Sequence, residues 1–99
     1  MNRKISLCMI VKNEEDVLGR CLESVRDLAD EMIVTDTGSS DRTREIAEGF
    51  GANVSSFEWT DDFSQARNFS FSLATGDFLL WLDADDVISP ASKEEFLRL

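Results

Sequence analysis

Residues 5–18 have the sequence ISLCMIVKNEEDVL, in which an apolar, β-branched run changes abruptly to amide and acidic residues. The run 5–11 is almost continuously apolar, which is typical of a strand buried on both faces of a parallel sheet. Asn13 is a good N-cap, and the acids after it complement a helix dipole. Apolar residues then recur every three or four positions, so we expect a helix at about 14–27 that lays one stripe on the sheet.

The same alternation of strand and helix continues along the chain. Further strands are predicted at 32–35, 53–55 and 78–82, and further helices at about 41–49, at about 62–74 and from Ser89 and Pro90 onward. We expect Asp41 to cap the first of these helices, Gly49 to stop it in a left-handed conformation, and Gly76 to end the next. Alternating units imply right-handed crossovers and a parallel sheet with helices on both faces.

The composition limits the kinds of protein this can be. A chain of 99 residues that is 42% apolar suits one small domain. A net charge of −10 argues against a nucleic-acid surface, which needs clustered Lys and Arg. We find neither an uncharged apolar run of about 18 residues nor a signal-peptide pattern, so we expect no membrane segment and a cytoplasmic location. Cys8 and Cys21 lie at apolar positions and are predicted to be buried without a disulfide.

Polar residues cluster at the predicted carboxyl ends of three strands, at 12–14, 36–38 and 83–85. In a parallel α/β sheet, ligands bind at that edge, so we expect the three clusters to converge on one site. The glycine-rich dinucleotide-binding and P-loop patterns are both absent, which removes the usual nucleotide-binding motifs.

Asp83 and Asp85 follow a strand that is too apolar to lie on the surface. Their spacing places two carboxylates on the same side of an extended segment. Hard oxygen ligands of this kind suit Mg²⁺ or Mn²⁺ shared with a diphosphate, whereas zinc favours His or Cys. The alternative is a water-facing loop that caps the next helix. An EF-hand is excluded because Ile88 stands where that loop needs glycine and Pro90 interrupts it.

Two other residues have both a ligand-binding and a structural interpretation. Asp36 ends the second strand, where a carboxylate can meet a ribose or base, but it can also start the turn at Thr37 and Gly38. Arg67 can offer a fixed donor fork to a diphosphate, or it can pair on the surface with Asp61 or Asp62.

Four segments, 6–15, 33–43, 63–68 and 76–86, together resemble family 2 glycosyltransferases in order and spacing, most closely bacterial cytosolic members. The resemblance covers nearly the whole chain. It implies the GT-A fold, a three-layer, Rossmann-like α/β half domain with a mainly parallel sheet in the strand order 3-2-1-4. On this basis residues 1–99 are expected to be the N-terminal nucleotide-sugar-binding part, with the acceptor-binding half absent.

The resemblance also implies roles for individual residues. The donor would be a UDP- or GDP-sugar bound with Mg²⁺ or Mn²⁺, and the acceptor stays unknown. The base pocket would be lined by the loop residues Val11, Lys12, Asn13 and Glu14. Asp36 would contact the base or ribose, and Arg67 would approach the nucleotide. After the fourth strand, Asp83 would bind the ribose or a metal-bound water, and Asp85 would bind the metal. Ala84, between them, would also belong to the nucleotide-sugar site.

An inverting enzyme needs a general base, and the resemblance implies that this carboxylate lies in the acceptor-binding second half of the domain. We therefore assign no catalytic residue and expect the 99-residue chain to be inactive alone. Asp86 follows the metal-binding pair too closely to serve. A stand-alone nucleotide-binding module stays open as an alternative. A metal-dependent nucleotidyltransferase is the other alternative, although it would need glycines in the loop 12–15. A response-regulator receiver would need an Asp where the third strand ends at Ser55 and Ser56.

The strand 78–82 is predicted to lie at the edge of the sheet. It is wholly apolar, with no Lys or Pro to discourage pairing with another chain. We expect a homodimer through this edge, with a last helix folded over it as the alternative.

Overall fold

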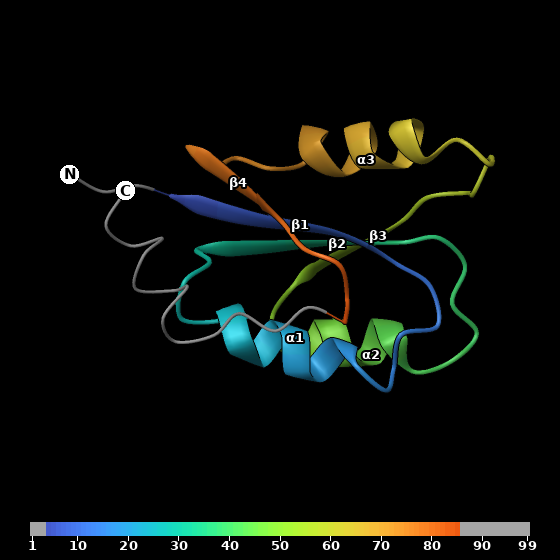
Figure 1. Ribbon diagram of the computed structural model, residues 1–99, viewed down its shortest axis with the longest axis horizontal. Coiled ribbons are helices and arrows are strands. Elements are labelled where there is room, and N and C mark those ends of the chain that lie inside the picture. Colours follow the sequence, from blue (N-terminus) through green and yellow to red (C-terminus); the bar gives the residue numbers. More distant parts are fainter. Residues whose placement is uncertain (1–3, 86–99) are drawn as a thin grey trace.

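The computed structural model describes residues 4–85. Strands and helices alternate along this part of the chain, as β1 (Ile5–Val11), α1 (Leu18–Val25), β2 (Glu31–Asp36), α2 (Thr43–Gly49), β3 (Asn53–Ser56), α3 (Phe63–Ser72) and β4 (Phe78–Trp81). The strands form one sheet in the order β3-β2-β1-β4, and every pairing is parallel. α3 covers one face, while α1 and α2 cover the other (Figure 1). The predicted three-layer α/β fold and its strand order are confirmed.

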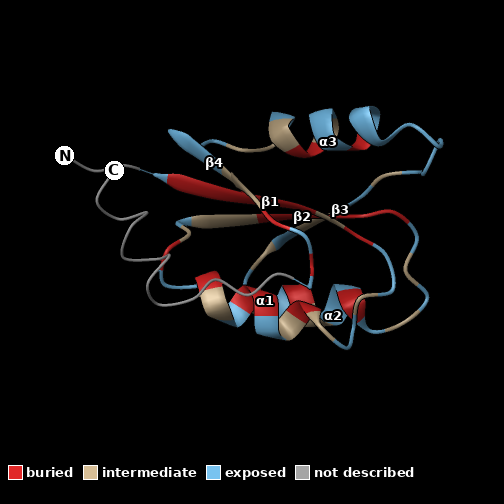
Figure 2. Ribbon diagram, viewed as in Figure 1, coloured by how far each residue is buried: buried red, intermediate tan, exposed pale blue. Residues whose placement is uncertain are grey.

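β1 is the central strand, and its apolar run is buried almost throughout (Figure 2). Leu7, Met9 and Val11 belong to the core cluster shared with α1. On the opposite face, the Cys8 thiol contacts the carbonyl oxygen of Ser70 in α3 at 3.9 Å. Burial on both faces is the physical reason that this strand tolerates so few polar residues.

α1 begins at Leu18, so the prediction that it starts directly after an Asn13 cap is wrong. Asn13 has a φ of 53°, and its side-chain oxygen accepts a hydrogen bond from the Ser40 amide at 2.8 Å. The Glu14 carbonyl accepts from the amides of Val17 and Leu18, which closes a turn ahead of the helix. Asn13 is therefore used to join two loops, and the acids that follow it lie in a turn instead of the first turn of the helix.

α2 begins close to the predicted position but ends differently. The Asp41 carboxylate accepts a hydrogen bond from the Thr43 amide at 2.9 Å, so it caps the helix from one residue before the cap position. Gly49 is the last helical residue and is not left-handed. The left-handed glycine is Gly51, with a φ of 81°, because the chain makes one more bonded turn before it leaves for β3.

α3 is capped by Asp62, whose carboxylate accepts from the Ser64 amide at 3.0 Å. The helix ends at Ser72, so Gly76 is not its stop. Gly76 instead passes so close to β1 that an added Cβ would lie 2.8 Å from the Lys4 carbonyl oxygen. Its amide donates to the Ser6 hydroxyl at 2.8 Å. Glycine is needed here for backbone contact between the turn and the start of β1.

The remaining structural predictions concern the two cysteines, membrane-spanning helices and the residues after β4. Cys8 and Cys21 are both buried, and no disulfide joins these two described residues. Burial raises the pKa of the Cys8 thiol. Within residues 4–85, no helix has the length and apolar character to cross a membrane. Asp86 and the helix predicted from Pro90 lie outside the described residues.

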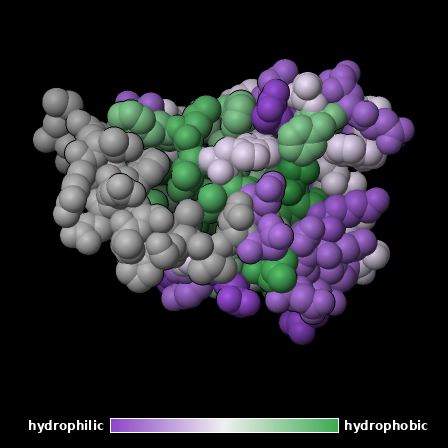
Figure 3. All heavy atoms as spheres, in the orientation of Figure 1, coloured by the Kyte–Doolittle hydropathy of each residue, from purple (hydrophilic) through white to green (hydrophobic). Residues whose placement is uncertain are grey.

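β4 lies at one edge of the described sheet and pairs with β1. Phe78 and Leu79 are 42% and 48% exposed. Apolar side chains gather over β4 in Figure 3, which has the orientation of Figure 1. The edge position of this strand is confirmed, and the homodimer stays a prediction.

Candidate functional site

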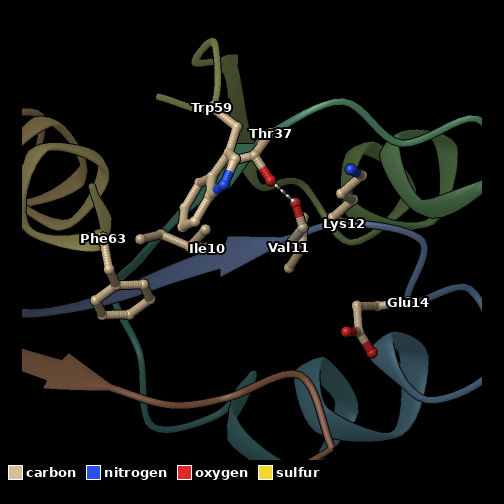
Figure 4. A pocket seen from close by; sticks show the side chains of 7 residues that line it. All are labelled: Ile10, Val11, Lys12, Glu14, Thr37, Trp59 and Phe63. Carbon is tan, nitrogen blue, oxygen red and sulfur yellow. Dashed lines mark hydrogen bonds between the residues drawn. The ribbon is translucent and has the colours of Figure 1, made fainter. Parts of the chain in front are cut away.

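A pocket of about 290 Å³ opens at the carboxyl ends of β1 and β2. It is lined by residues from the end of β1, the loop after β2 and the segment that enters α3, namely Ile10, Val11, Lys12, Glu14, Thr37, Trp59 and Phe63 (Figure 4). Two of the three polar clusters predicted to converge therefore contribute to one cavity. Its position is the one where parallel α/β sheets bind ligands.

The loops after β1 and β2 are joined by hydrogen bonds. The Asn13 amide donates to the Ser39 hydroxyl at 2.9 Å, and the Glu14 amide donates to the Thr43 hydroxyl at 2.8 Å. Thr37 donates to the Val11 carbonyl twice, from its amide at 3.0 Å and from its hydroxyl at 3.2 Å. These bonds hold the pocket wall in place before any ligand arrives. Asn13 itself is not among the lining residues, so its contribution is to position its neighbours.

Asp41 extends this connection beyond the pocket. Its carboxylate accepts from the Glu15 amide at 3.3 Å as well as from Thr43. The hydrogen bond from the Thr43 hydroxyl is the main cause that lowers the pKa of Asp41, and desolvation acts in the opposite direction. An ionised carboxylate at this position repels anions, which agrees with a loop that shapes the pocket and does not bind phosphate itself.

Asp36 is only 3% exposed. Its carboxylate accepts hydrogen bonds from the amides of Gly38 at 3.3 Å and Ser39 at 3.1 Å, and from the Ser39 hydroxyl. The turn-forming role that the sequence left open is thus present. Thr37, its neighbour, is the residue of this loop that lines the pocket.

The pocket has an apolar side and a charged side. Figure 4 shows Ile10, Trp59 and Phe63 on the first and Lys12 and Glu14 on the second. The sequence did not predict Trp59 and Phe63 as site residues. The sequence feature that could have indicated them is the pair of aromatic residues on either side of Asp61 and Asp62, just before α3 at the same edge of the sheet.

Asp83 and Asp85 follow β4, the neighbour of β1, at the same edge of the sheet. Both are exposed, whereas Ala84 between them is 5% exposed. Both carboxyl-bearing residues are therefore on the solvent side of the residue that packs into the core. The Cys21 thiol of α1 donates to the Asp83 carbonyl at 3.6 Å. Neither carboxylate lines the pocket, so the third cluster shares this edge of the sheet but does not contribute to the cavity.

Arg67 is exposed on α3 and does not line the pocket. Within residues 4–85, no ion pair joins it to Asp61 or Asp62, so the surface pairing considered from the sequence is not formed. No three acidic or cysteine side chains of the described region gather closely enough to hold a metal by themselves. A cation at Asp83 and Asp85 would therefore need oxygen atoms from a ligand.

Comparison with known proteins identifies the family. The family model described as glycosyl transferase family 2 matches residues 6–99. The chain belongs to this family. Its fold is that of the GT-A glycosyltransferases: it superimposes on glucosyl-3-phosphoglycerate synthase of Mycobacterium tuberculosis with a TM-score of 0.72 and 29% identity. The alignment covers 84% of this chain and 34% of that enzyme, which was solved with Mn²⁺, UDP and glucosyl-3-phosphoglycerate.

Two curated bacterial relatives of this family 2 chain are much longer than the chain itself. A TPR repeat-containing protein of Synechococcus elongatus is 55% identical over 83 residues, which is 84% of this chain and 21% of the relative. An uncharacterized glycosyltransferase of Rickettsia bellii is 37% identical over 95 residues, 96% of this chain and 32% of the relative. The chain thus spans about a third or less of the length of the proteins it matches.

Proposed function

We propose that residues 1–99 are the N-terminal donor-binding part of an inverting glycosyltransferase and bind a UDP- or GDP-sugar with Mg²⁺ or Mn²⁺. The observation that carries this proposal is the placement of the preorganised pocket at the ends of β1 and β2, at the same edge of the sheet as the two exposed carboxylates that follow β4. A nucleoside would occupy the pocket, and its diphosphate would extend toward Asp83 and Asp85. The Mn²⁺ and UDP bound to the M. tuberculosis enzyme support the same ligand class.

The residues present fit a magnesium or manganese ion. Asp83 and Asp85 offer hard carboxylate oxygens, and the chain contains no histidine. Two protein ligands leave coordination positions for phosphate oxygens and water. When bound, the ion would act as a Lewis acid that neutralises the leaving diphosphate. The proposal includes both metals.

The pocket residues have distinct proposed roles. Val11, Lys12 and Glu14 line the nucleoside pocket, and Asn13 holds their loop. The Asp36 carboxylate already accepts three hydrogen bonds, so of its roughly four acceptor positions about one is left for a ribose or base.

Arg67 and the segment after β4 complete the proposed donor site. Arg67, exposed on α3, would approach the nucleotide as a donor fork. Ala84 packs into the core and fixes the backbone between the two proposed metal-side carboxylates.

Titration calorimetry with UDP and GDP tests this function. We expect binding in the presence of Mg²⁺ or Mn²⁺ and its loss with a chelator, because the diphosphate would otherwise face Asp83 and Asp85 unscreened. Asp85→Asn should weaken metal-dependent binding at least about tenfold, the loss of one charged ligand contact being worth about 1.4 kcal/mol or more. Glu48→Gln is the matched control, since it removes one exposed charge from α2. Equal UDP affinity with and without chelator would refute the metal-bridged site.

A further inference from the structure

Two large aromatic side chains are exposed at the mouth of the pocket. Trp59 is 41% exposed and Phe63 is 47% exposed. Aromatic side chains stabilise a fold mainly by burying their apolar surface. Two half-exposed aromatic side chains that line one cavity therefore indicate a surface that a ligand can cover. In Figure 4 both project toward the cavity, from the loop before α3 and from its first residue.

Contacts outside the pocket hold each of these side chains. The Trp59 indole N–H donates to the Asp61 carboxylate at 3.0 Å, and Asp61 has a left-handed φ of 61°. The Phe63 ring packs edge-to-face on Trp81, with 6.0 Å between centroids and an interplanar angle of 86°. The hydrogen-bonding group of Trp59 is thus already satisfied within its own turn. What this residue presents to the pocket is aromatic surface.

The opposite side of the pocket carries Lys12 and Glu14. A ligand that matches both sides needs flat, apolar faces together with polar groups around its rim. A nucleobase has this character, and aromatic side chains bind bases by stacking on those faces. A sugar ring can also pack one C–H face on an aromatic ring. In the donor orientation proposed above, however, the nucleoside occupies this pocket and the sugar lies beyond the diphosphate, so the base is the group that meets Trp59.

We propose that Trp59, positioned by Asp61, is the stacking platform for the nucleobase of the donor, with Phe63 as the adjoining wall. This inference rests on the proposed donor-binding function and adds the specific residues that recognise the base. Trp59 is a binding residue in this account, and Asp61 is a positioning residue.

Calorimetry with UDP and Mn²⁺ on the full chain tests the role of Trp59. Trp59→Ala and Trp59→Leu should each weaken UDP binding about tenfold, since Leu restores apolar bulk without a π-face. Trp59→Phe should recover most of the affinity. Phe78→Ala is the control, because it removes an aromatic side chain of similar exposure, 42%, from the opposite end of the sheet. Circular dichroism of each variant establishes that it is folded.

Fluorescence gives a second readout that needs no metal. The chain has two tryptophans, so in a Trp81→Phe background Trp59 is the only one. UMP added with a chelator should change its emission saturably. In the same background, Asp61→Ala should weaken this response to UMP, because the indole loses the acceptor that orients it, and Asp61→Asn should restore much of it.

The outcomes separate this inference from the function on which it rests. If wild type binds UDP and Trp59→Ala binds it equally well, the stacking platform is refuted while the donor site stands. If Trp59→Ala loses affinity for UDP-glucose but not for UDP, the indole contacts the sugar and the inference is again wrong. If wild type binds neither UDP nor UMP, the donor-binding proposal itself fails.

Discussion

Glu31 connects the turn before β4 to the first two strands of the sheet. Its carboxylate accepts hydrogen bonds from the Thr75 amide at 2.8 Å, the Thr75 hydroxyl at 2.7 Å and the Ser6 hydroxyl at 3.0 Å. The Lys4 ammonium lies 3.2 Å from the same carboxylate. The hydrogen bond from the Thr75 hydroxyl is the largest cause that lowers the pKa of Glu31, from 4.5 to about 2. Partial desolvation acts in the opposite direction.

This pKa shift makes stability depend on pH. The folded-state pKa lies below the unfolded value, so the stabilisation is fully present above pH 4.5 and is lost as the pH falls toward 2. The whole shift would correspond to about 3 kcal/mol, at about 1.4 kcal/mol for each pKa unit. The side chain is 21% exposed, and solvent screening reduces the contribution to about 1–2 kcal/mol.

Glu31→Gln should therefore lower the free energy of unfolding by about 1–2 kcal/mol at pH 7. Urea unfolding, followed by circular dichroism at several pH values, measures this difference directly. The wild type and the variant should converge in stability as the pH approaches 2. Glu48→Gln, an exposed control, should change stability by less than about 0.5 kcal/mol. A difference that is the same at pH 7 and pH 2 would show that Glu31 acts through packing and not through its charge.

Three further predictions concern the loops, the edge strand and catalysis. Asn13→Ala should cost about 1–2 kcal/mol of stability in chemical denaturation and weaken UDP binding, whereas Asn13→Gly should keep the left-handed backbone and lose only the two hydrogen bonds from Ser40. Leu79→Lys should convert the predicted dimer to a monomer in sedimentation; Leu79 is 48% exposed, whereas Leu80 packs against the core. A dimer that tolerates this charge would refute pairing through β4. The 99-residue chain should transfer no sugar from UDP-glucose in a product assay, because we expect the general base in the acceptor-binding half and not among these residues; turnover by this chain would contradict that assignment.

The elements that could be predicted from sequence are those whose burial leaves a regular pattern. β1 and the alternation of strands and helices followed from apolar runs interrupted by helical periodicity, whereas the order of the four strands came from the family resemblance. Asn13 and Gly49 were misassigned because a left-handed backbone or a cap depends on what the loop meets in space. For Asn13 that partner is Ser40, 27 residues away in the sequence.

The candidate site was predictable in part for a similar reason. Residues at the carboxyl ends of parallel strands converge by topology, so the contributions of Lys12, Glu14 and the loop after β2 followed from the strand assignments. Trp59 lies on an irregular segment, where no periodicity indicates which way a side chain points. The choice between a turn-forming and a ligand-facing Asp36 depended on the hydrogen bonds of Ser39, which appear only in the folded chain.

The most direct test of the donor site is an NMR titration of the ¹⁵N-labelled chain with UDP and Mg²⁺, repeated with a trace of Mn²⁺. The proposed donor site predicts chemical-shift changes concentrated at the pocket residues, including Lys12, Thr37 and Trp59. It also predicts that paramagnetic Mn²⁺ selectively broadens the amide signals around Asp83 and Asp85 when UDP is present. Shift changes at the opposite end of the sheet, around Glu31 and Thr75, or Mn²⁺ broadening that avoids Asp83 and Asp85, would contradict it.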